Sequence, residues 1–144
     1  MKVADILSAK GSKVMTVRPT DTIVTLAHRL KLERVGAMIV SRDGKTIDGI
    51  ISERDVTHGL ATHGAELSAL LVSNLMTREV VTCSPDDSIA EIARIMTRHR
   101  VRHIPVQEKG ALVGVVSVGD VVKHRLDEME MEVNVMRDYA IAHQ

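Results

Sequence analysis

Two short stretches of the sequence each place a serine and an aspartate three positions apart, directly after an apolar run. They are GIISERDV, residues 49–56, and GVVSVGDV, residues 114–121. A serine at the start of a helix lies beside free backbone N–H groups, where the helix dipole favours anions. An aspartate one turn later can accept hydrogen bonds from both hydroxyls of a ribose. Serine and aspartate are also ordinary helix-capping residues, so the spacing alone leaves a nucleotide site and a plain cap both open.

The two octets belong to a longer internal repeat. Residues 14–40 align with residues 80–106 at a constant offset of 66, and the octets follow at an offset of 65. Residues 3–8 align with residues 72–77 at an offset of 69. Each change of offset falls in a predicted loop, where changes of length are tolerated best. The register therefore predicts two units of the same fold.

Each unit is predicted to form a strand, a helix, two further strands and a last helix. The first helix of each unit carries one apolar face. These faces comprise Ile23, Leu26, Ala27 and Leu30 in the first unit and Ile89, Ile92, Ala93 and Met96 in the second. Gly49 and Gly114, which open the octets, allow another group to approach the strand closely. The fold class is therefore α/β (α+β), with two β-α-β-β-α repeats.

The predicted boundaries are 1–66 for the first repeat, 67–126 for the second and 127–144 for a C-terminal helical tail. A unit of about 60 residues with one aliphatic face is marginally stable alone. We therefore expect the two units to share one core about a pseudo-twofold axis, which creates equivalent clefts. The tail has apolar residues at helical spacing and is expected to dock on the body or on a second subunit.

The composition narrows the class of partner. Of 144 residues, 19 are basic and 19 acidic, so nothing favours DNA or an anionic membrane as the main partner. Tyr139 is the sole aromatic residue, which excludes an aromatic platform for single-stranded nucleic acid. Cys83 is the sole cysteine, and no apolar run is long enough to span a membrane. We therefore expect a cytoplasmic protein.

The duplicated unit resembles a tandem pair of cystathionine β-synthase (CBS) domains, also called a Bateman module. The resemblance covers residues 3–126 and is carried by GIISERD and GVVSVGD, by VRPTD (residues 17–21) and by RVRHIPV (residues 100–106). The second unit departs from the entry motif, because CSPDD begins with Cys83. The resemblance implies a stand-alone regulatory homodimer, two pairs packed through helices into a flat disc. It also implies an adenine ligand: AMP, ADP, ATP, S-adenosylmethionine or NAD(H).

The resemblance also implies roles for particular residues. It assigns Asp55 and Asp120 to the ribose hydroxyls, and Ser52 and Ser117 to the surroundings of the ribose or phosphate. Thr16 and Thr82 would face the base. Main-chain groups would line the adenine pockets at Ala37, Met38, Ile39, His103, Ile104 and Pro105.

The cations that could hold a phosphate are unequally distributed between the repeats. Arg54 lies in the first octet, where the second octet has Gly119. Arg100 and Arg102 precede the second repeat's hairpin, where the first repeat has Arg34 and Gly36. A guanidinium can bind a phosphate as a planar fork, although cations are also favoured at any helix C-terminus. We therefore predict one tighter and one weaker nucleotide site.

Three other kinds of function are weighed against the nucleotide sensor. A metal site could use His99 and His103, but no third ligand has suitable spacing. An enzyme could use Cys83, but no base is evident beside it, and a buried structural thiol is the better interpretation. A ligand-free dimerisation scaffold remains open, since fold does not fix function. We predict a non-enzymatic sensor without a catalytic cofactor, which signals to an unidentified protein through its conformation or assembly.

Overall fold

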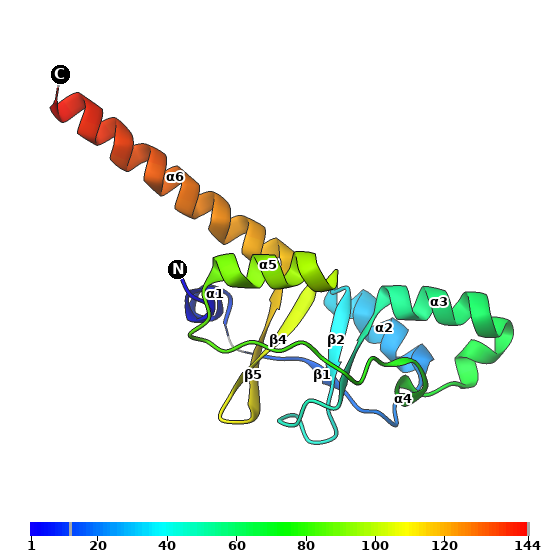
Figure 1. The fold of residues 1–144 in the computed structure, drawn as a ribbon. Helices are drawn as coiled ribbons and strands as arrows, with labels where there is room; N and C mark the ends of the chain where they lie inside the picture. Colours follow the sequence, from blue (N-terminus) through cyan, green and yellow to red (C-terminus); the bar gives the residue numbers. More distant parts are fainter. Residues whose placement is uncertain (12, 144) are drawn as a thin grey trace.

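The two repeats form two small sheets covered by helices (Figure 1). The computed structural model describes residues 1–11 and 13–143. The first half contains α1 (Val3–Lys10), β1 (Thr16–Val17), α2 (Ile23–Glu33), β2 (Ala37–Val40), β3 (Gly49–Ser52), α3 (Glu53–His63) and the 3-10 helix η1 (Gly64–Ala69). The second half contains α4 (Val72–Leu75), α5 (Ile89–His99), β4 (His103–Glu108), β5 (Ala111–Ser117) and α6 (Val118–Ala142).

The two sheets are equivalent, but the second lacks a full first strand. In the first sheet β1 is parallel to β2, and β2 is antiparallel to β3. In the second sheet β4 is antiparallel to β5, and the counterpart of β1 is a single parallel bridge between Cys83 and Val106. A second bridge would need an N–H at Pro105, which proline does not have. The first strand predicted for the second repeat is therefore reduced to one bridging residue, Cys83.

Helices α2 and α5 confirm the predicted apolar faces. Ile23, Leu26 and Leu30 are buried on α2, and Ile89, Ile92 and Met96 are buried on α5. Ala27 is exposed and Ala93 is half-buried. Each helix starts with a hydroxyl cap, in which the side chain of Thr22 or Ser88 accepts a hydrogen bond from a backbone N–H.

The hydrophobic core is divided into two clusters, so the prediction of one shared core is wrong. One cluster lies in the second repeat and includes Val3 and Ile6 of α1, and the other lies in the first repeat and includes Val72 of α4. Backbone bonds fix this exchange, from Val3 N–H to the Asp87 carbonyl and from Val72 N–H to the Asp21 carbonyl. Each repeat thus completes its core with the short helix that precedes the other repeat's sheet.

The octet glycines are positions of close approach, as predicted. A Cβ at Gly49 would lie 2.7 Å from the carbonyl oxygen of Thr77, and a Cβ at Gly114 would lie 2.5 Å from a methyl carbon of Leu7. Thr77 and Ile50 also exchange two backbone hydrogen bonds of 2.9 Å. Because these glycines have no side chain, the segment after α4 can pack closely against β3, and α1 can pack closely against β5.

Helix α6 continues without a break through the predicted tail and projects away from the sheets (Figure 1). Val121, near its start, is buried, whereas residues 129–143 are all exposed. The first alternative for the tail, docking on the body, is therefore wrong, and the second, docking on a second subunit, stays a prediction. Within residues 1–11 and 13–143, no helix is both long and apolar enough to cross a membrane.

Two candidate ligand clefts

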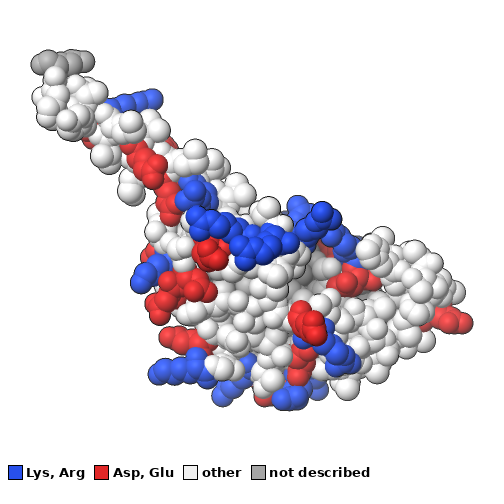
Figure 2. Space-filling model, in the orientation of Figure 1, with Lys and Arg blue, Asp and Glu red and all other residues white. Residues whose placement is uncertain are grey.

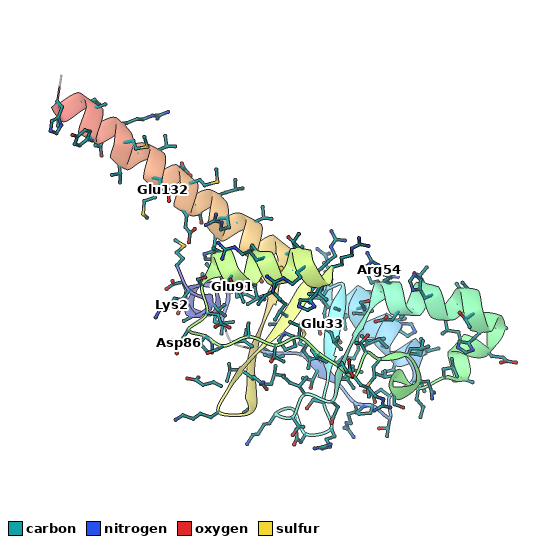
Figure 3. All side chains as sticks on the ribbon, viewed as in Figure 1. Lys2, Glu33, Arg54, Asp86, Glu91 and Glu132 are labelled. Carbon is teal, nitrogen blue, oxygen red and sulfur yellow. The ribbon has the colours of Figure 1, made fainter. Side chains whose placement is uncertain are left out.

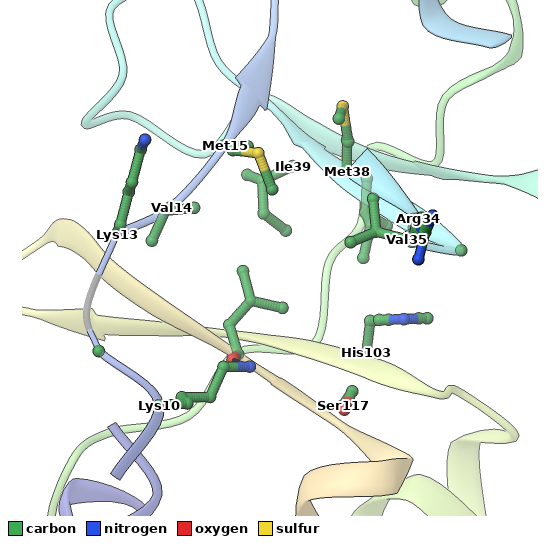
Figure 4. A pocket seen from close by; sticks show the side chains of 15 residues that line it. Lys10, Lys13, Val14, Met15, Arg34, Val35, Met38, Ile39, His103 and Ser117 are labelled. Atoms are coloured by element: carbon green, nitrogen blue, oxygen red, sulfur yellow. Dashed lines mark hydrogen bonds between the residues drawn. The ribbon is translucent and has the colours of Figure 1, made fainter. Parts of the chain in front are cut away.

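Two clefts lie on either side of the place where the repeats meet. The first, called the Asp55 cleft, has a volume of about 760 Å³. The second, called the Lys10 cleft, has a volume of about 350 Å³ (Figure 4). Four residues line both clefts: Gly36, Ala37, Ile50 and His103. Both volumes are in the range of small-molecule sites.

Both repeats contribute to each cleft. The Asp55 cleft combines the first octet with residues 77 and 79–81 and residues 100–103 of the second half. The Lys10 cleft combines residues 10–11 and 13–15 and residues 34–39 of the first half with Val115 and Ser117 of the second. A ligand in either cleft would therefore contact both repeats.

The octet fixes the position of Asp55 through a capping box at the start of α3. Ser52 donates from its backbone N–H (2.8 Å) and from its hydroxyl (3.1 Å) to Oδ2 of Asp55. Ser52 Oγ also accepts a bond from the N–H of Asp55. Among the described residues, no group donates to Oδ1 of Asp55, and the side chain is half-buried in the cleft lining. One carboxylate oxygen is thus positioned and available to a ligand.

Three arginines line the same cleft. Arg54 lies in the first turn of α3, Arg100 ends α5 in the left-handed conformation (φ 53°), and Arg102 precedes β4. All three are exposed, and Figure 3 labels Arg54 at the start of α3. Figure 2 shows basic side chains gathered along α5 and the base of α6. Glu53 and Glu79 also line the cleft and add negative charge, so an anionic group of a ligand would be attracted to the three arginines.

The Lys10 cleft differs because its octet aspartate is already bound. Lys10 Nζ donates to Oδ2 of Asp120 (2.7 Å) and to the carbonyl oxygen of Val115 (2.9 Å). The N–H of Ser117 also donates to Asp120. Burial acts to raise the pKa of Asp120, but the bonds from Lys10 and Ser117 outweigh it and hold that pKa below its ordinary value.

The difference lies in the segments that precede each sheet. The offset of 69 holds for residues 3–8, and the loop of residues 9–13 that follows is three residues longer than its counterpart, so Lys10 has no single counterpart in the second repeat, whose corresponding segment contains Glu79. Lys10 and Lys13 line the Lys10 cleft, whereas Glu79 lines the Asp55 cleft. A carboxylate cannot form the ion pair that Lys10 makes, so Asp55 has no equivalent of the Lys10–Asp120 contact.

His103 lies between the clefts and lines both of them. Burial lowers the pKa of His103 below its ordinary value, and the nearby charges of Arg102 and Lys10 lower it further. The imidazole is therefore held neutral beside the two clefts at neutral pH.

The structure brings together most of the predicted site residues. Those lining the Asp55 cleft are Ser52, Arg54, Asp55, Arg100 and Arg102. Those lining the Lys10 cleft are Met38, Ile39 and Ser117, and those lining both are Ala37 and His103. Those outside both linings are Thr16, Thr82, Ile104, Pro105 and Asp120.

The residues outside the linings have other contacts. Thr82 accepts a hydrogen bond from the side chain of Gln107 (3.2 Å), and the carbonyl of Thr16 accepts one from Arg29. Ile104 is fully buried, and the carbonyl of Pro105 accepts a bond from the N–H of Cys83 (3.0 Å).

Sequence reasoning missed the residues that precede each sheet. Lys10 and Lys13 in one cleft and Glu79 in the other lie in segments of unequal length. A signal was available, because the offset between the repeats changes from 69 to 66 within these segments. Their charges are opposite, which marks them as a place where the two halves differ.

Cys83 is buried, as predicted. Burial and the nearby charge of Asp87 raise the pKa of its thiol to about 12. A thiol with so high a pKa is protonated at neutral pH and is a poor nucleophile. Within residues 1–11 and 13–143, no group of three or more His, Cys, Asp or Glu side chains could hold a metal ion.

Comparison with known proteins defines the class of molecule. The pattern of the CBS domain matches residues 3–62 and 72–127, so the chain belongs to the CBS domain family as a tandem pair. The CBS domain-containing protein YhcV of Bacillus subtilis is 30% identical over 124 residues, which cover 86% of this chain and 87% of that protein.

Solved structures agree with this assignment. A crystal structure of the CBS-domain containing protein ATU1752 from Agrobacterium tumefaciens has a TM-score of 0.84 at 39% identity, over 87% of this chain and 99% of that one. The CBS domain pair of protein MJ0100, in complex with 5'-methylthioadenosine and S-adenosyl-L-methionine, has a TM-score of 0.76 over 85% of this chain and 98% of that one. The sequence identity between this chain and MJ0100 is 22%, so the similarity of these two structures is evidence for the fold alone.

Proposed function

We propose that this protein is a regulatory module that binds an adenine nucleotide, AMP in the first instance, in the Asp55 cleft. The observation that carries the proposal is the convergence of Asp55, Arg54, Arg100 and Arg102 on one cavity of about 760 Å³. A fixed carboxylate oxygen suits a ribose diol, and guanidinium groups suit a phosphate. The adenosine-type ligands of protein MJ0100 support an adenine compound in this fold.

The weaker site is proposed for the Lys10 cleft. There the octet carboxylate is paired with Lys10 at 2.7 Å, so a ribose would have to compete with an ammonium group. The cavity is also smaller, at about 350 Å³. ADP, ATP and NAD(H) need more room than AMP and are proposed as alternative ligands of the Asp55 cleft.

The proposed output is a change in the arrangement of the two repeats. A nucleotide in the Asp55 cleft would contact the first octet and residues 100–103 together, and thus bridge two separate hydrophobic clusters. Such a ligand shifts the population only if it binds one arrangement more tightly than the other. We propose that the shift acts on a regulated protein or on a homodimer, without a chemical reaction. A cytoplasmic location stays a prediction.

Calorimetric titration of the purified chain tests the proposal. The titrants are AMP, adenosine and inorganic phosphate, with circular dichroism to verify the fold. We expect one dominant AMP site per chain and at least about tenfold weaker binding of adenosine, because adenosine leaves the arginines without a phosphate. Equal affinities for AMP and adenosine would contradict the arginine assignment. No binding of any adenine nucleotide by the folded chain would overturn the function and favour a ligand-free scaffold.

A further inference from the structure

Helix α6 projects away from the sheets (Figure 1), and it carries an exposed apolar stripe that the clefts do not explain. Its residues recur alternately four and three positions apart along the helix. They are Val122, Leu126, Met129, Val133, Met136 and Ala140, called the α6 seam. All six are exposed, the first five by 46% to 70%. Val122, Met129 and Met136 are seven positions apart, as are Leu126, Val133 and Ala140, and this seven-residue repeat is the pattern of a left-handed coiled coil.

We infer that the α6 seam pairs with the α6 seam of a second copy of this chain in a parallel two-stranded coiled coil. The charges beside the seam carry the choice of partner and orientation. In a parallel, in-register pair, each residue before an a position faces the residue five places later in the partner. Arg125 then meets Glu130 of the partner subunit, and Glu132 meets Arg137 of the partner subunit. By symmetry these contacts occur twice, which gives four opposite-charge pairs.

An antiparallel pair has the opposite result. If the seams are aligned with Met129 against Val133, then Glu130 faces Glu130 of the partner subunit and Glu132 faces Glu132 of the partner subunit. Lys123 in the same alignment faces a second cation, Arg137 of the partner subunit. Like charges beside a seam disfavour that pairing. The helix is thus complementary to itself in the parallel orientation.

The contacts of α6 with its own body leave the seam accessible. Arg125 bonds Glu128 at 2.8 Å, and Glu128 also lies 3.4 Å from the amino group of Met1. A guanidinium has five N–H donors, so Arg125 can keep this bond and still meet a partner's glutamate. Residues 122–140 span roughly 27 Å at 1.5 Å per residue, which provides six layers of contact.

Disulfide capture tests the pairing and its orientation. In the parallel pair, position 136 faces its own copy, whereas position 131 lies on the outer face of the helix. We expect the variant Met136→Cys to form a covalent dimer with diamide at least about tenfold faster than Met131→Cys, because only the first thiols are adjacent. Met131 is exposed like Met136, and the unmodified chain controls for buried Cys83. Equal rates for the two variants, or no covalent dimer from Met136→Cys, would overturn the inference.

Charge reversal at the flanks provides an independent test by analytical ultracentrifugation. Glu132→Arg and Arg137→Glu each replace two opposite-charge pairs with two like-charge pairs, so each should weaken self-association about tenfold. A mixture of the two variants should associate as a heterodimer, because each reversed charge then meets its complement. An antiparallel pair would instead be strengthened by Arg137→Glu, since that change relieves the repulsion from Lys123. That result, or wild-type association in both variants, would contradict the parallel coil.

Discussion

The two clefts are built from equivalent elements, but the octet aspartate has a different partner in each. Asp55 bonds only the Ser52 backbone and hydroxyl among the described residues, and three arginines line its cleft. Asp120 has the same bond to the backbone of its octet serine, Ser117, but Lys10 also binds it at 2.7 Å. The backbone and the caps are thus duplicated, while the charges around them are not.

The comparison of the two clefts indicates at which positions the copies of a duplicated fold can differ without a loss of stability. Capping boxes and buried strands hold each repeat together, so changes there are costly. Lys10, Glu79, Arg54 and Arg102 are all exposed at the cleft edges, where substitution costs little folding free energy. The same scaffold can therefore carry one open carboxylate and one that is blocked.

The largest effect is expected from Asp55→Ala compared with Asp120→Ala. Loss of the Asp55 carboxylate should weaken AMP binding by about tenfold to a hundredfold, because a hydrogen bond to a charged group contributes roughly 1.5–3 kcal/mol. Asp120→Ala should change the dominant site by less than about threefold, because its carboxylate is bound to Lys10. Calorimetric titration with AMP measures both affinities.

The two aspartate variants are matched controls for the fold. Each aspartate accepts a bond from the backbone N–H of its octet serine in the same capping box. Each substitution should therefore cost about 1 kcal/mol of stability from the capping box, and Asp120→Ala also loses its ion pair with Lys10. If AMP binding falls equally in both variants, the two clefts are not distinguished by their octets.

A smaller effect is expected from Arg100→Ala compared with Arg34→Ala. Both arginines end a helix in the left-handed conformation, with φ values of 53° and 55°. Arg100 lines the Asp55 cleft and Arg34 lines the Lys10 cleft. We expect about tenfold weaker AMP binding for Arg100→Ala and no change at the dominant site for Arg34→Ala, with similar unfolding free energies. The reverse ranking would place the phosphate in the Lys10 cleft.

Lys10→Ala should reduce stability slightly and only above acidic pH. The free energy of unfolding at pH 7 should fall by about 0.2–1 kcal/mol, as for a partly exposed ion pair. Because Lys10 helps to hold the pKa of Asp120 below its unfolded value, this stabilisation is present above that unfolded value and is lost as pH falls through the folded one. Urea unfolding of both chains between pH 7 and pH 3 measures this difference.

Lys13→Ala is the control for the lysine variant. Lys13 lines the same cleft, and it forms no ion pair with any described residue. A pH-dependent loss of stability in Lys13→Ala equal to that in Lys10→Ala would mean that the general charge of the cleft, and not the contact with Asp120, is responsible.

The repeat made the paired architecture predictable. The offset of 66 predicted both helices with their apolar faces, and the structure has α2 and α5 at those positions. The serine caps of α3 and α6 were predicted from the octets, because a cap depends on residues a few positions apart, whereas the part that each aspartate plays in a capping box was not predicted. These features are local in sequence, which is why pattern and spacing were sufficient.

The features that were not predicted depend on contacts between distant residues. Nothing in the pattern of residues 3–8 indicates that Val3 packs in the core of the second repeat, because the exchange of short helices between the repeats depends on the path of the chain. The pairing of Lys10 with Asp120 joins residues 110 positions apart. Pro105 is visible in the sequence, but its effect on the bridge to the first strand can be predicted only when the strand register is known.

The smallest effect concerns His103, which lines both clefts and so reports on either site. Burial and the charges of Arg102 and Lys10 keep its pKa below the ordinary value in the free protein. A bound phosphate adds negative charge nearby and should raise that pKa, so binding favours proton uptake. By linkage, AMP affinity should then increase about twofold to threefold between pH 7.5 and pH 6 through this residue.

His103→Gln separates this effect from the titration of AMP itself. The nucleotide phosphate also changes its protonation near pH 6, and that contribution is the same for both proteins. The pH dependence of AMP affinity should therefore be shallower in His103→Gln than in the wild type, by the contribution of His103. NMR titration of the His103 ring with and without AMP should show the higher pKa in the complex. Identical pH dependence in the two proteins would mean that neither cleft brings a phosphate close to His103.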